Sequence, residues 1–423
     1  MISFGQRTMR SLAIALTLSV PTVAAFAQAP AEAEILNNYA DLALAGYEDS
    51  LSTAKALDAA IDALIATPSE ATLNAARDAW KAARVPYQQT EAFRFGNPIV
   101  DEWEGRVNAW PLDEGLIDYV DASYGSESDS NPLYVANVIA NPKIIIDGVE
   151  LDATNITPQL LQDHLQEAAG IESNVATGYH AIEFLLWGQD LNGTGTGPGA
   201  GERPYTDYST ADNADRRAAY LKSASELLIS DLEEMVGNWT ADGEARAALP
   251  DLGVSVILTG MGSLSFGELA GERMKLGLLL HDPEEEHDCF SDNTHNSHFY
   301  DAVGIRNVYH GSYTRVDGTV VSGPSMSQLV AAKDAALDKE LSGLLDETIA
   351  KMTVMVDRAE AGEAYDQQIG EGNVEGNAVV QDAIDALIAQ TRGIERAVAL
   401  LGLEDAVTIE DSDSLSNPDA VFE

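Results

Sequence analysis

The sequence contains one cysteine, Cys289, and few basic residues, and each shortage excludes a class of protein. A single cysteine cannot form an internal disulfide, and its position excludes lipid attachment at a processed N-terminus. Lysine and arginine number 24 against 69 aspartates and glutamates, which gives a formal net charge of −45. Phosphate backbones and anionic membrane surfaces are repelled by such a chain, so we expect no nucleic-acid partner. Cations, in contrast, concentrate near a negative surface.

Long apolar runs are also scarce, and the clearest one lies at the N-terminus. Residues 11–25 are uncharged and mostly apolar, they follow Arg7 and Arg10, and they lead into Ala25-Phe26-Ala27. This pattern predicts a signal peptide over residues 1–27, cleaved after Ala27, and therefore an exported protein. The run is shorter than the ~20 residues of a membrane span and no second run of that length follows, so we expect a soluble chain without a span. Loss of Arg7 and Arg10 takes the basic residues from 24 to 22 and the net charge from −45 to −47.

Helical periodicity dominates the rest of the chain. Apolar residues recur at helical spacing after a predicted cap at Thr67 as far as Tyr87, and again over 221–235, 341–356 and 380–401. Two β-prone runs, 143–151 and 313–321, each contain an Asp-Gly pair, which predicts a short hairpin in each half. We therefore predict an all-α fold of two pseudo-symmetric helical bundles, each with a small β-hairpin insertion. The predicted domains are residues 28–210 and 211–423, separated after the glycine-rich loop 192–201.

The segment 178–188 carries the clearest candidate site. If it is helical up to a cap at Gly188, His180 and Glu183 lie one turn apart among apolar neighbours. A carboxylate in such surroundings is costly unless it is paired, protonated or bound to a cation. Helical bundles present inward-facing metal ligands with this spacing, while a hydrogen-bonded structural pair is the alternative.

Two other places offer further ligands. Glu91 lies near the end of an aromatic-rich helix, where Arg94 could equally neutralise it. The stretch 284–298 contains three of the seven histidines and many carboxylates, with His287, Asp292 and His295 as candidates. Imidazole combined with carboxylate suits iron, manganese, zinc or copper better than calcium. A solvated acidic loop is the alternative for this stretch.

Taken together, these segments resemble the imelysin family, also classified as peptidase family M75. The signature of that family is Gly-x-His-x-x-Glu, which Gly178, His180 and Glu183 match. The resemblance extends over most of the mature chain. It implies two pseudo-symmetric bundles with the site between them, in proteins of the bacterial periplasm or outer membrane that are linked to iron acquisition. The supporting stretches are Ala79-Trp80, 87–96, 107–111, 267–274, 286–295 and 304–309.

The peptidase designation requires separate evidence. A hydrolytic zinc site needs three protein ligands, an open position for water and a general base. Phe184 follows Glu183, so the helix lacks the second histidine of a His-Glu-x-x-His or a His-x-x-Glu-His motif. We therefore favour binding of a divalent or trivalent cation or a metal chelate over proteolysis. Iron is the first candidate, zinc and copper are alternatives, and envelope iron-transport components are the expected partners.

Overall fold

The computed structural model describes residues 1, 29–195 and 199–422. Residues 2–27 of the predicted signal peptide, with the cleavage site after Ala27, lie outside the described residues. The described chain is mostly helical, and its strands form two small two-stranded antiparallel sheets, as the sequence predicts. The helices are α1 (Glu32–Ala66), α2 (Glu70–Gln88), α3 (Pro98–Glu104), α4 (Pro158–Leu160), α5 (Gly178–Trp187), α6 (Ala214–Trp239), α7 (Glu244–Leu252), α8 (Ser255–Ser263), α9 (Leu276–Leu280), α10 (Thr294–His310), α11 (Met326–Lys333), α12 (Ala335–Glu360), α13 (Tyr365–Ile369), α14 (Val374–Leu401) and α15 (Asp413–Ser416).

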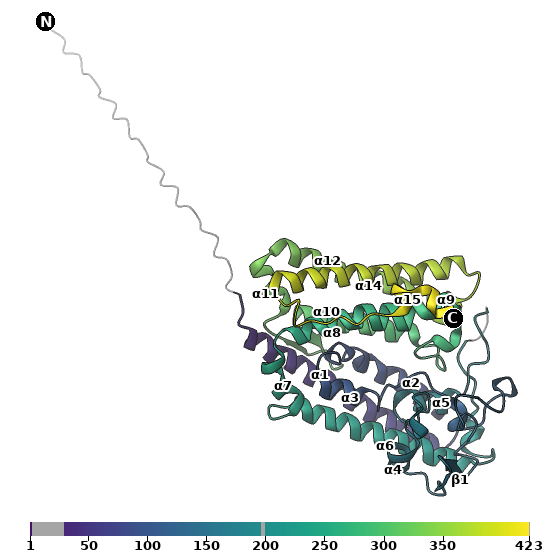
Figure 1. Ribbon diagram of the computed structural model, residues 1–423. Coiled ribbons are helices and arrows are strands. Elements are labelled where there is room, and N and C mark those ends of the chain that lie inside the picture. Colours follow the sequence, from purple (N-terminus) through teal and green to yellow (C-terminus); the bar gives the residue numbers. More distant parts are fainter. Residues whose placement is uncertain (2–28, 196–198, 423) are drawn as a thin grey trace.

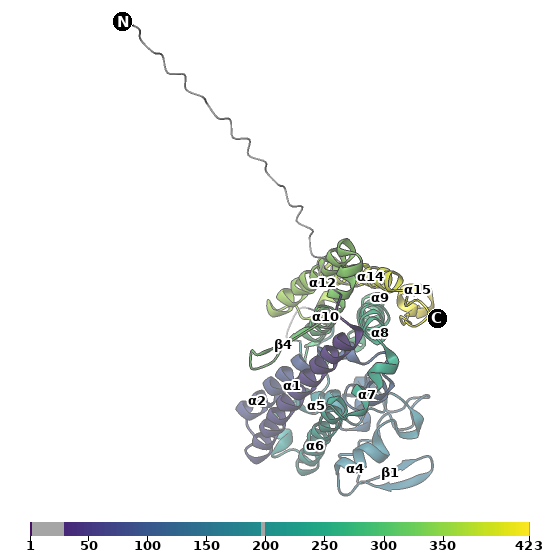
Figure 2. The ribbon, with the colours of Figure 1, turned by 90° about the vertical axis from the view of Figure 1, so that its left-hand side faces the viewer.

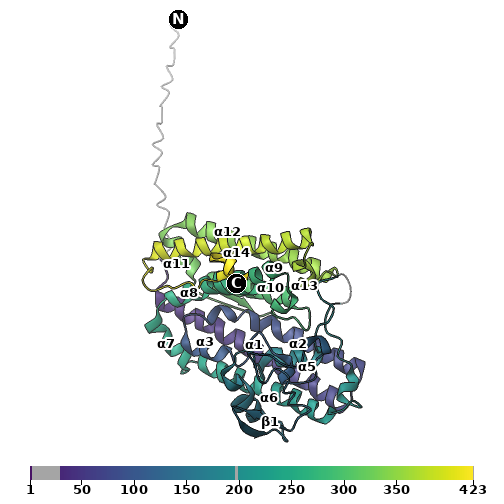
Figure 3. The same cartoon turned by 45° about the vertical axis from the view of Figure 1, so that its right-hand side comes forward.

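The long helices lie in two layers (Figure 1). In the N-terminal layer, here residues 29–252, α1 packs against both α2 and α6, and α5 packs against α6. Figure 2 shows α1, α2, α5 and α6 grouped together below α10 and α12. In the C-terminal layer, here residues 255–422, α12 packs against α14 and α10. Figure 3 shows α10 between α12 and α14 on one side and α1 and α2 on the other. Helices α6 and α7 follow residue 210 in sequence and still pack with α1.

Both predicted hairpins are present. Strands β1 (Lys143–Ile146) and β2 (Val149–Asp152) pair across Asp147 and Gly148, whose φ angles are 51° and 79°. Two positive φ angles are the geometry that favours Asp-Gly in a two-residue turn. Strands β3 (Ser312–Thr314) and β4 (Val320–Ser322) pair across a longer loop that contains Gly318.

The start of α2 differs from the prediction. The sequence predicts a cap at Thr67, but α1 continues to Ala66 and α2 begins at Glu70. Ser69 is the cap, and its hydroxyl accepts a hydrogen bond from the Thr72 backbone N–H at 3.2 Å. Helix α1 is 35 residues long and ends at Ala66, immediately before Thr67, so only a short turn separates it from α2. The N-cap of α2 is therefore Ser69, two residues after the predicted position.

Helix α1 also contacts the C-terminal layer. The Asn38 side chain donates a hydrogen bond to the carbonyl of Gly311 at 3.0 Å. The buried carboxylate of Asp49 accepts hydrogen bonds from the Tyr313 hydroxyl at 2.9 Å and from Arg315 Nε at 3.0 Å. The first helix is therefore hydrogen-bonded to the hairpin of the second layer.

Helix α8 continues through the π-helical segment η7 (Leu264–Lys275) into α9. Among the described residues, no single helix has both the length and the apolar composition needed to cross a bilayer. Only α7 and the helix Ser255–Leu280 meet both criteria as a pair, and they are bent by 105°. The C-terminal segment packs closely along η7. A Cβ atom at Gly267 would lie 2.8 Å from the carbonyl oxygen of Glu410.

Candidate metal centre

Helix α5 carries the Gly-x-His-x-x-Glu motif, and its first residue explains the glycine. Gly178 has a φ of 76°, and a Cβ atom there would collide with the backbone carbonyl of Val107. The next residue, Tyr179, donates its backbone N–H to the same Val107 carbonyl at 2.8 Å. The helix ends at Gly188, as predicted, where φ is 74°. Glycine therefore allows α5 to begin directly against another segment, and the whole helix is buried.

His180 and Glu183 form a fully buried pair. His180 Nδ1 lies 2.9 Å from Glu183 Oε2, and both side chains have 0 % exposure. The other carboxylate oxygen, Oε1, accepts hydrogen bonds from the backbone N–H of Ser291 at 3.0 Å and from its hydroxyl at 2.7 Å. His180 Nε2 is buried and has no hydrogen-bond partner among the described residues. A histidine held at Nδ1 by a carboxylate, with Nε2 free, is the usual arrangement of a metal-binding imidazole.

Two residues from the loop before α10 meet His180. The ring of His287 lies 4.8 Å from that of His180, measured between centroids. One ligand atom each from His180, His287 and Asp288 lies within 4.8 Å of the other two, and all three residues are buried. Bonds of ~2.1 Å in a tetrahedral site place ligand atoms about 3.4 Å apart, so this spacing is compatible with a bound cation. Among the described residues, this is the one group of three that converges in this way.

Asp288 is held in place by Arg84 of α2. Arg84 Nη2 lies 2.8 Å from Asp288 Oδ1, and Asn293 and Ser297 donate hydrogen bonds to Oδ2. Burial alone would raise the pKa of Asp288, but the Arg84 charge and these hydrogen bonds lower it to about 2. Asp288 is therefore ionised and supplies one negative charge to the group.

Both histidines are neutral, as a metal ligand must be. Burial lowers the pKa of His180 to about 3, and the Arg84 charge acts in the same direction. Burial also lowers the pKa of His287, with further contributions from Arg273 and His180. For Glu183, burial and the Asp288 charge raise the pKa well above its ordinary value. A cation bound at His180 Nε2 would offset the cost of ionising the buried Glu183 carboxylate, because the positive charge favours the ionised form.

The structure places the predicted ligand Glu91 in a separate ion-pair network. Glu91 is buried, and its carboxylate lies 2.8 Å from Arg273 Nη2. Arg273 also contacts Glu268 at 2.7 Å and Asp301 at 3.1 Å. The cation that neutralises Glu91 is therefore Arg273 of η7, not its neighbour in sequence, Arg94.

Asp292 and His295 lie beyond the converging group. Burial raises the pKa of Asp292 to about 7, with Asp366 and Asp190 acting in the same direction. His295 lies in the first turn of α10, where its Nε2 is 3.1 Å from the Asn296 side-chain nitrogen. Metal binding by either residue stays a prediction.

Sequence reasoning missed Asp288 as a candidate ligand and Arg84 as its partner. The two residues are 204 positions apart, so no spacing pattern connects them. His298 is a further buried histidine without a hydrogen-bond partner at either ring nitrogen, and its ring stacks on Tyr365 at 5.0 Å. The only available signal was the density of histidines and carboxylates in the 286–298 stretch.

These features define a class: a mostly helical protein with buried imidazole and carboxylate groups that converge between its two layers. The sequence profile of the imelysin family, peptidase family M75, matches residues 43–394, and the chain therefore belongs to the imelysin family.

Two relatives are similar to parts of this chain. Iron-regulated protein A of Synechococcus elongatus is 37 % identical over 71 residues, which is 16 % of this chain and 20 % of that protein. The alignment thus spans only a fifth of the relative. A solved structure from Parabacteroides distasonis, described as an iron-regulated protein A precursor, covers 88 % of this chain and 96 % of its own. Its TM-score is 0.62 at 21 % sequence identity, so it shares the fold.

Proposed function

We propose that this protein binds a transition-metal cation at His180, His287 and Asp288, and that it serves bacterial iron acquisition outside the cytoplasm. One observation carries the proposal: three buried ligand atoms from two separate segments lie within 4.8 Å of one another. Neutral imidazoles and an ionised carboxylate are donors that suit a transition-metal cation. Cation capture also agrees with the formal net charge of −45.

The donor set favours iron. Two histidines and one carboxylate are the ligands of many non-haem iron(II) sites, and zinc and copper also accept them. The relatives are named for regulation by iron, which supports a role in iron physiology without naming a ligand. Delivery to an envelope transport partner would follow capture by an exported protein.

Glu183 acts in this proposal as the residue that orients His180. Both of its carboxylate oxygens already have partners in His180 and Ser291. Carboxylates in this position fix the imidazole tautomer and strengthen the metal bond. The family motif would then contribute one direct ligand, His180, and one supporting residue.

A metal-dependent peptidase is the second candidate. Three protein ligands beside a cavity of about 450 Å³ that reaches His287 leave room for water and a peptide. A general base is still required. Glu183 is occupied by His180 and Ser291, and Asp288 is paired with Arg84. This distribution of partners favours binding over hydrolysis.

The test is metal analysis of mature protein purified without chelators, followed by titration of Fe²⁺ under anaerobic conditions. We expect one metal per chain in the parent, and loss of binding in His180→Ala and His287→Ala. His164→Ala is the matched control, because His164 is exposed and does not belong to the converging group. Stoichiometric binding that survives in both site variants would refute the proposal. Metal-dependent cleavage of a general peptide substrate, lost in His180→Ala, would establish the peptidase instead.

A further inference from the structure

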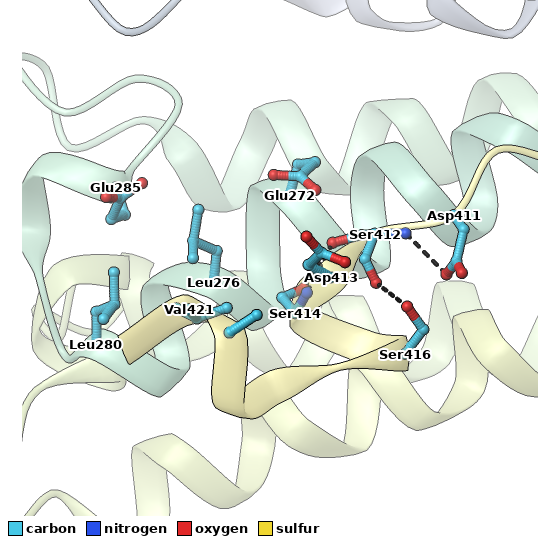
Figure 4. Close-up of a pocket in the computed structure, with 11 residues that line it drawn as sticks. Glu272, Leu276, Leu280, Glu285, Asp411, Ser412, Asp413, Ser414, Ser416 and Val421 are labelled. Carbon is cyan, nitrogen blue, oxygen red and sulfur yellow. Dashed lines mark hydrogen bonds between the residues drawn. The ribbon is translucent and has the colours of Figure 1, made fainter. Parts of the chain in front are cut away.

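Two adjoining cavities lie beside the proposed centre. The inner cavity, about 450 Å³, is lined by His287 and Trp110. The outer cavity, about 600 Å³, lies under the C-terminal segment 411–421 (Figure 4). Glu272, Leu276 and Glu285 line both cavities, so their side chains form the common boundary.

The outer cavity is strongly acidic. Its charged side chains are Glu272, Glu285, Asp411 and Asp413, and it contains no basic residue. In the part of the chain that the structure describes, none of these four carboxylates has a cationic partner within 4.0 Å. Figure 4 shows Glu272 beside Asp413, with Glu285 and Asp411 toward opposite ends of the cavity.

The inner cavity contains two guanidinium groups, but neighbouring carboxylates already neutralise both. Arg273 contacts three carboxylates, as described above. Arg94 lies 2.9 Å from Asp101 and 3.5 Å from both Glu104 and Glu268. Neither arginine therefore retains a free positive charge to attract an anion.

We infer that the two cavities form an entry route that admits a hydrated metal cation and rejects an anionic metal chelate. This inference rests on the proposed function and specifies its substrate class. Carboxylates around a cleft with low-dielectric walls focus the field and raise the local cation concentration. The same field repels a metal chelate that has a net negative charge. The C-terminal segment supplies two of the four outer charges.

The test compares association rates for one metal in two charge states. Co²⁺ and its 1:1 nitrilotriacetate complex, which has a net charge of −1, are mixed with mature full-length protein. Quenching of tryptophan fluorescence reports arrival, because the Trp110 ring lies 6.3 Å from His287. The test variant is Glu272→Gln/Glu285→Gln/Asp413→Asn. The control, Asp357→Asn/Glu360→Gln/Glu371→Gln, removes the same charge from exposed positions that line neither cavity.

We expect the test variant to bind free Co²⁺ with unchanged stoichiometry, about tenfold more slowly than the control at low ionic strength. The difference should shrink in 1 M salt, where the Debye length falls to about 3 Å. Association of the nitrilotriacetate complex should be unchanged or faster. Equal Co²⁺ association rates in test variant and control would overturn the entry route. That result would leave the proposed function intact. The proposed function fails only if the parent binds no metal, or if His180→Ala and His287→Ala both still bind it.

Discussion

Replacement of Glu183 by glutamine tests how the motif works. The carboxylate can accept a hydrogen bond from the His180 Nδ1–H group, which leaves the Nε2 lone pair for a cation. In Glu183→Gln, the amide oxygen would still accept from Ser291, so the amide nitrogen would face Nδ1 and donate to it. The histidine would then carry its proton on Nε2, the position that a metal needs. The substitution keeps the shape of the side chain and reverses the tautomer.

The expected loss of metal affinity follows from the role of Glu183 in orienting His180. Loss of such a partner weakens metal binding about 10- to 100-fold, which corresponds to about 1.4–2.7 kcal/mol. With metal at about a thousand times the parent Kd, the parent gains about 4.1 kcal/mol of stability, and a variant with 30-fold weaker binding gains about 2.1 kcal/mol. The metal-free variant should be at least as stable as the parent, because a neutral amide avoids the cost of a buried carboxylate.

The assay is chemical denaturation with and without Fe²⁺ or Zn²⁺, together with direct titration. Ser291→Ala is the matched control, since it removes one hydrogen bond to Glu183 and leaves the backbone N–H contact and the charge. Its metal affinity should change far less. If Glu183→Gln binds metal as the parent does and only unfolds more easily, the His180–Glu183 pair is structural and the site assignment is wrong.

Three further predictions concern the support of the site and the stability of the chain. Arg84→Met should destabilise the protein by about 3–5 kcal/mol in urea unfolding at pH 7, because Asp288 loses its buried partner. An unchanged unfolding midpoint would contradict the role of the Arg84–Asp288 pair. Gly178→Ala should cost at least about 2 kcal/mol in the same assay, from the positive φ and the contact with Val107; a neutral result would show that the backbone can move. Burial raises the pKa of Glu114 to about 7, so the folded chain holds a proton that the unfolded chain releases above about pH 4.5. Ionisation of Glu114 therefore lowers the free energy of unfolding of the parent as the pH rises from 4.5 to 7. Glu114→Gln lacks this loss, so the difference in unfolding free energy between variant and parent should be up to about 3 kcal/mol larger at pH 8 than at pH 4, in favour of the variant. A pH-independent difference between Glu114→Gln and the parent would disprove the shift.

The sequence predicted those features that depend on local chemistry. Asp147-Gly148 and Gly188 specify a turn and a helix end through their own φ angles, and both are found where they were expected. His180 and Glu183 were recognisable because their partners lie within one helical turn. The distant partners were not predictable, since Asp288 meets Arg84 only after α2 and the loop before α10 have packed together. The pseudo-symmetry and the domain boundary near residue 210 stay predictions.

The hydrogen bonds of α1 to the second layer restrict how far the two layers can separate when a ligand binds. His180 belongs to one layer and His287 to the other, so separating them would require the layers to move apart. Such a movement would break the bonds of Asn38 and Asp49 to the β3–β4 hairpin and its flanks, and would leave a buried carboxylate without partners. The proposed centre is thus preorganised, and we expect fixed geometry to set its selectivity. We expect metal exchange to be limited by replacement of coordinated water rather than by domain closure, so that the dimensions of the empty and loaded protein in solution are the same.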